Sequence, residues 1–177
     1  MFHRIARRWP VWLVATFAFP IAGLVGRAIA GPIEGVASGL ASGVAAGLVV
    51  GSAQVLAAGE RDRRVALGWT VATAAGLGLA AGLGAGLQLT LLVVGLVAGT
   101  VMGAGQWLAA GAPAGRLVAW PLVVAAAWSI GWTVTTAVGV DPAAGWAVFG
   151  VSGALVSQVL TTIGARVLRS PAGLATT

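Results

Sequence analysis

The chain has 177 residues, of which 59% are hydrophobic and only 8% are charged, with a net charge of +6. A soluble domain usually carries about 25% charged residues, so this composition excludes a water-facing surface; it also excludes disorder, which needs low hydrophobicity and high charge. The absence of cysteine excludes disulfides, thiol catalysis and cysteine-ligated metals.

Six apolar runs follow one another along the chain. They cover about 9–27, 33–58, 65–86, 88–111, 117–139 and 143–165. Each run can cross a hydrocarbon core of about 30 Å as a helix, the form that satisfies the backbone hydrogen bonds of a segment in lipid. The sequence therefore predicts an all-α membrane protein with six transmembrane helices in one domain over residues 1–177, ending in a short cytoplasmic tail at 166–177.

The ten positive charges, all arginines, predict the orientation in the membrane. Nine lie before the first run, between the second and third, between the fourth and fifth, or after the sixth: Arg4, Arg7, Arg8, Arg61, Arg63, Arg64, Arg116, Arg166 and Arg169. These segments lie on one side of the membrane, and the connections on the other side contain only Arg27. The positive-inside rule then places both termini in the cytoplasm. The arginines do not form one face or stripe, which argues against a nucleic-acid partner. The expected location is the bacterial inner (cytoplasmic) membrane, with the lipid bilayer as the partner.

Three glutamines mark an internal repeat. Gln54, Gln106 and Gln158 are 52 residues apart both times (106 − 54 and 158 − 106), and Arg64 and Arg116 share this spacing. A period of 52 fits two spans with two short turns. The repeat predicts three tandem helical hairpins, about 9–58, 65–111 and 117–165, around a pseudo-threefold axis. The glutamines either bind neighbouring helices together or form a polar ring at the mouth of a central path.

Glycine recurs every four residues in several runs, which places it on one face of a helix. The best stripes are Gly35, Gly39, Gly43, Gly47 and Gly51 in the second run and Gly95, Gly99 and Gly103 in the fourth. Small residues allow close backbone approach, and such packing drives helix association in lipid. The stripes predict helix contacts, either within the bundle or with another protomer or subunit.

A longer pattern surrounds two of the glutamines. Its fullest copy consists of Gly99, Gly103, Gln106, Trp107 and Leu108. A second copy consists of Gly47, Gly51, Gln54 and Leu56, and in it Val55 replaces the tryptophan. In this pattern the chain resembles a group of small, uncharacterised bacterial multi-pass membrane proteins with repeated G-x-x-x-G-x-x-Q-W-x-x-L helical hairpins. The resemblance implies a repeated-hairpin architecture and no particular activity. Arginine without lysine, among Ala, Gly and Val, is typical of GC-rich bacterial coding.

Residues that could carry out catalysis are scarce. The segment Gly150–Gly153 matches the G-x-S-G of rhomboid proteases, but the chain's single histidine, His3, lies outside the apolar runs and cannot serve as the base. One histidine and four scattered acids do not form a metal site. We therefore expect no enzyme and no cofactor. We read Glu60 and Asp62 as solvated charges, and we expect an outer ion pair between Arg27 and Glu34.

Two functions fit these features. The first is a non-enzymatic helix-packing or accessory subunit of a larger membrane assembly, whose partners are other membrane subunits or further copies of the chain. The alternative is a channel or small transporter component for a neutral solute or lipid. A polar cavity that opens outward favours the alternative, whereas a dry interior with an exposed small-residue face favours the accessory subunit.

Overall fold

The computed structural model describes residues 1–87, 90–112, 118–139 and 150–169. All regular secondary structure in these ranges is helical. The elements are α1 (Phe2–Arg7), α2 (Trp9–Val14), the 3₁₀ helix η1 (Ala15–Phe17), α3 (Ala18–Ala30), α4 (Val36–Ala58), α5 (Arg63–Leu87), α6 (Leu91–Ala109), α7 (Ala119–Ala137) and α8 (Val151–Arg169). The all-α fold class is therefore confirmed for the described part of the chain.

Within the described ranges, five helical stretches are long and apolar enough to cross a membrane. They are Trp9–Ala30, Val36–Ala58, Arg63–Ala85, Leu91–Ala109 and Val151–Leu168. The sequence predicts six spans, and the remaining run corresponds to α7, which has 19 residues and no charge. Three tryptophans and four Ser or Thr residues make α7 less apolar than its neighbours.

The first span is a broken helix. It consists of α2, η1 and α3, with the 3₁₀ turn at Ala15–Phe17. Pro20 follows this turn within α3. Proline has no N–H to donate to the carbonyl four residues earlier, and its ring crowds that carbonyl. A short 3₁₀ segment is a common local response to such a helix interruption.

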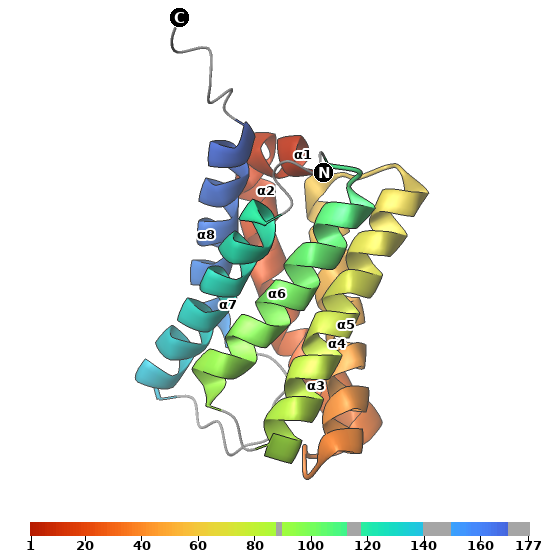
Figure 1. Cartoon of the computed structure of the whole chain (residues 1–177), viewed down its shortest axis with the longest axis vertical. Helices are drawn as coiled ribbons and strands as arrows, with labels where there is room; N and C mark the ends of the chain where they lie inside the picture. Colours follow the sequence, from red (N-terminus) through yellow and green to blue (C-terminus); the bar gives the residue numbers. More distant parts are fainter. Residues whose placement is uncertain (88–89, 113–117, 140–149, 170–177) are drawn as a thin grey trace, which may run out of the picture.

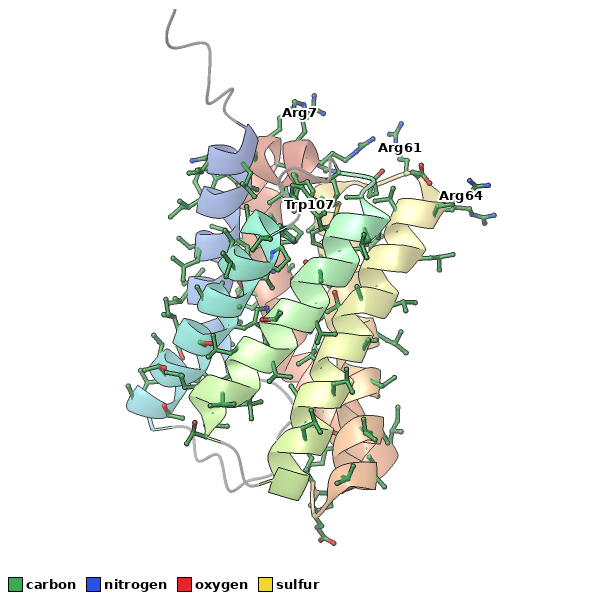
Figure 2. The ribbon with its side chains drawn as sticks, viewed as in Figure 1. Arg7, Arg61, Arg64 and Trp107 are labelled. Atoms are coloured by element: carbon green, nitrogen blue, oxygen red, sulfur yellow. The ribbon has the colours of Figure 1, made fainter. Side chains whose placement is uncertain are left out.

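Consecutive helices from α3 to α8 pack against one another, and the N-terminal elements close the bundle (Figure 1). The elements α1, α2 and η1 all contact α8, while α2 and η1 also contact α4. The N-terminus and the last turn of α8 lie at the same end of the bundle (Figure 1). Arg7, Arg61 and Arg64 project from this end, which we call the arginine end (Figure 2).

Four glycines on α4 lie against the backbone of α5. A Cβ added to Gly39 would lie 2.6 Å from the carbonyl oxygen of Ala81, and one added to Gly51 would lie 2.8 Å from the Cα of Thr70. Gly43 and Gly47 meet α5 in the same way. These contacts are with backbone atoms, which cannot rotate away as a flexible side chain can. This stripe therefore faces another helix of the same chain.

The stripe on α6 contacts α7 in the same manner. A Cβ on Gly95 would lie 2.7 Å from the Cα of Ser129, and one on Gly103 would lie 2.6 Å from the Cα of Pro121. Gly99, between them, meets Ala125. Both stripes thus join the second helix of one predicted hairpin to the first helix of the next.

Gly35 does not belong to the α4 stripe, and its assignment to helix packing is wrong. It precedes the first residue of α4 as the N-cap, and a Cβ added there would meet no atom within 4 Å. Its N–H donates to the Ser38 hydroxyl, 3.1 Å away. The four-residue spacing extends to a residue that precedes α4, and outside the helix such a spacing does not define a helix face.

Candidate functional site

A buried polar cluster lies where the second helix of each predicted hairpin meets the first helix of the next. At the α4–α5 junction, the indole Nε1 of Trp69 donates to Oε1 of Gln54 over 3.0 Å. Trp69 lies near the start of α5 and is buried, as is Gln54. The bond connects the two helices whose backbones are brought together by the glycine stripe of α4.

The α6–α7 junction has the same arrangement with one additional bond. The indole Nε1 of Trp120 donates to Oε1 of Gln106 over 3.0 Å. The amide nitrogen of Gln106 donates to the hydroxyl of Thr73, also over 3.0 Å, and this hydroxyl donates to the carbonyl of Trp69. Gln106 therefore links α5, α6 and α7, and its amide oxygen and nitrogen both have partners in the protein.

Gln158 on α8 is less well satisfied. Its Oε1 accepts a long bond of 3.5 Å from Nε2 of Gln54, so these two amides meet across the bundle. Its own Nε2 has no partner among the described residues. The Nε1 of Trp12 and the Oγ1 of Thr16 are likewise buried without a partner there. Every one of the three glutamines is at most 4% exposed.

Aromatic rings fill the interior next to these amides. The ring of Phe2 packs against those of Trp107 and Trp120, with centroids 5.1 and 4.7 Å away, and also contacts Trp69. Trp107 lies inside the bundle near the arginine end (Figure 2). Deeper in the bundle, Phe19 packs against Trp128 at 5.8 Å. Indole side chains often anchor a protein at the membrane interface, but here most of them form the core.

Glu60 holds the N-terminal helix onto the turn between α4 and α5. Its Oε2 lies 3.2 Å from Nε of Arg4 and 3.5 Å from the terminal amine of Met1. Arg4 also donates to the carbonyl of Gly59 over 2.8 Å. The Glu60 side chain is only 5% exposed, so the interpretation of Glu60 as a solvated charge is wrong. A sequence separation of more than fifty residues hid this pair from sequence reasoning.

The environment of Glu60 stabilises its charged form. Burial alone raises the pKa of this carboxyl. Backbone N–H bonds from Asp62 and Arg61, together with the positive charges of the N-terminus and Arg4, lower the pKa by more than burial raises it. The pKa therefore lies below its ordinary value of 4.5.

We expect Glu60→Gln to lower thermal stability at pH 7 and to have little effect in acid. The folded chain binds the Glu60 proton less tightly than the unfolded chain, so the contribution of the carboxylate is complete above pH 4.5 and disappears as the pH falls through the lower folded-state value. The contribution should be about 1 kcal/mol, because Arg4 is partly exposed. Melting curves of both proteins from pH 7 to pH 3 test this; a constant difference across that range would contradict it.

The ion pair between Arg27 and Glu34 stays a prediction. Both residues lie in described parts of the chain. Glu34 is exposed, and its backbone N–H donates to the hydroxyl of Ser38 over 3.0 Å. Arg27 lies in the last turn of α3, before Gly31 turns the chain with a φ of 72°.

No family model matches this chain, and no curated protein or solved structure matches it either. The structure brings the three glutamines into one region with three tryptophans and two threonines, namely Trp12, Trp69, Trp120, Thr16 and Thr73. Sequence reasoning did not predict these partners. A W-x-x-x-T spacing at Trp12–Thr16 and Trp69–Thr73 was the available signal. The cluster is a structural junction made of amides, indoles and hydroxyls.

Proposed function

We propose that this protein is a non-enzymatic accessory subunit of an assembly in the bacterial cytoplasmic membrane. The observation that carries the proposal is an apolar groove on the outside of the bundle, between α7 and α8, with a volume of about 330 Å³. The interior near the arginine end is filled by Phe2 and tryptophan rings. A filled interior and an open outer groove favour helix docking over conduction.

The groove has the composition of a helix-docking surface. Small residues form part of its floor, and exposed aliphatic residues form its sides; the lining comprises Ala119, Val123, Ala126, Ala127, Ile130, Leu160, Ile163, Gly164, Val167 and Leu168. Small residues let another backbone approach closely, which is the main source of helix affinity in lipid. The glycine stripes of α4 and α6 are already covered within the chain. The groove therefore supports docking of one transmembrane helix from a different subunit.

Cysteine cross-linking tests this proposal, because the natural chain has no cysteine. Single variants Ile130→Cys and Ile163→Cys place a photoreactive maleimide at the groove, and Val71→Cys places it on an exposed face of α5. We expect both groove variants to give the same adduct, with a mass different from that of a dimer of the chain, and the α5 variant to give none. Adding Ala126→Phe should fill the groove and abolish the adduct. Equal cross-linking at all three sites, or cross-linking only to a second copy of the chain, would contradict a separate partner.

We also propose six spans, with α7 as the sixth. Its 19 residues are uncharged and it packs between α6 and α8, both of which are long and apolar enough to span. An even number of spans agrees with the position of the N-terminus and the end of α8 at the arginine end (Figure 1). By the positive-inside rule, the concentration of arginines at this end supports a cytoplasmic orientation.

A reporter fusion after Thr177 tests the orientation. We expect a fused alkaline phosphatase to be inactive and a fused green fluorescent protein to be bright, because the first needs export and the second folds in the cytoplasm. A second pair of fusions, placed after Ala85, should show the opposite result, since α5 ends at the other side. High phosphatase activity at Thr177 would exclude the six-span arrangement.

A further inference from the structure

Three buried polar groups have no partner in the described part of the chain where the N-terminal span closes the bundle. They are the Nε1 of Trp12 in α2, the Oγ1 of Thr16 in η1 and the Nε2 of Gln158 in α8. All three side chains are at least 97% buried. A buried hydrogen-bonding group that is left unsatisfied destabilises the folded state, so three such groups in one junction require a structural explanation.

Contacts place these groups in one neighbourhood. The elements α2 and η1 both pack against α8 and α4. The ring of Trp12 lies edge-on to that of Trp69 at 6.3 Å, Trp69 donates to Gln54, and Gln54 reaches Gln158. Thr16 follows Trp12 by one helical turn, as Thr73 follows Trp69. The three groups thus belong to the junction of α2, η1, α4 and α8.

The other two junctions show how such groups are satisfied. Trp69 and Trp120 donate directly to Gln54 and Gln106, and Thr73 accepts from Gln106. By the same pattern, Trp12 corresponds to Trp69 and Thr16 to Thr73. In the closing junction the indole, the hydroxyl and the amide are present, but the direct bonds among them are not formed.

We propose that the closing junction binds a water molecule that bridges Trp12, Thr16 and Gln158. One water accepts two hydrogen bonds and donates two. The indole and the amide supply two donors, and the threonine hydroxyl can accept. Buried waters in proteins make about three such bonds to groups that are otherwise unsatisfied. The site would hydrate one of the three junctions while the other two stay dry.

The indole N–H groups report directly on this water. In protein labelled with ¹⁵N at its eight tryptophans, we expect the Trp12 indole proton to show a cross-peak to long-lived water, and those of Trp69 and Trp120 to show none. Trp12→Phe identifies the signal. Thr16→Val should remove the cross-peak, whereas Thr73→Val, the matched change in a dry junction, should leave it. A Trp12 indole without any water cross-peak in the natural protein would overturn the proposal.

The sign of the stability change provides a second measurement. If the water bridges the three groups, Thr16→Val removes one of its partners and should lower the melting temperature by about 2–4 °C. If Thr16 is instead an unsatisfied hydroxyl in a dry core, the same change removes an unfavourable group and raises the melting temperature or leaves it unchanged. Either of the latter results would overturn the water site.

Discussion

Gly43→Ala should destabilise the protein measurably, and Gly43→Leu should prevent correct folding. A Cβ at this position would lie 2.7 Å from the carbonyl carbon of Leu77 and 2.8 Å from the Cα of Gly78, both in the backbone of α5. The two helices must therefore separate along their most extensive interface. Overpacking of this kind costs about 1–3 kcal/mol, which should lower the melting temperature by about 2–4 °C for each kcal/mol. Thermal unfolding in detergent, followed by circular dichroism, measures the shift.

Gly35→Ala provides the matched control for this prediction. Gly35 has the same four-residue spacing, but it lies at the N-cap, and its φ of −176° is open to any residue. A Cβ there meets no atom within 4 Å, so we expect no overpacking and only the weaker N-cap preference of alanine, about 0.5–1 kcal/mol. Equal melting temperatures for Gly35→Ala and Gly43→Ala would show that α4 and α5 are not in backbone contact.

Gln106→Leu should cost about 1–3 kcal/mol, because it leaves buried polar groups without partners. Trp120 would lose the acceptor of its indole N–H, and the hydroxyl of Thr73 would lose the amide that donates to it. The loss should appear in unfolding measurements in detergent. Leu108→Ala, two residues further on α6 at a position 69% exposed, should stay within about 0.5 kcal/mol.

A double-mutant cycle separates the hydrogen bond from general packing. If Gln106 and Thr73 interact directly, Gln106→Leu combined with Thr73→Val should cost less than the sum of the two single changes, with a coupling of about 0.5–3 kcal/mol. Additive losses would show that the glutamine stabilises α6 by filling space alone. Rates of solute entry into liposomes should not change in either variant, because the amide binds helices together.

In this bundle, hydropathy does not distinguish the residues that are buried in the interior from those that face outward. In water, polar and apolar faces separate, and the buried side of a helix can be read from the spacing of its residues. Here α4, α6 and α7 are apolar on all sides, because lipid and protein interior accept the same side chains. Trp12 is buried and Trp9 is 43% exposed with the Arg166 guanidinium over its ring, although both belong to the same apolar run. Hydropathy could not distinguish them.

The sequence by itself determined the helical membrane class, the position of the arginines and the glycine stripes of α4 and α6, because these depend on local composition and on the period of the helix. It also identified the three glutamines. Only the tertiary structure decided their partners: Trp69 for Gln54, Trp120 and Thr73 for Gln106, and Gln54 for Gln158. It likewise joined Arg4 to Glu60. Hydrogen bonds and ion pairs act over about 3 Å, and which groups come that close is fixed by how the helices pack against one another.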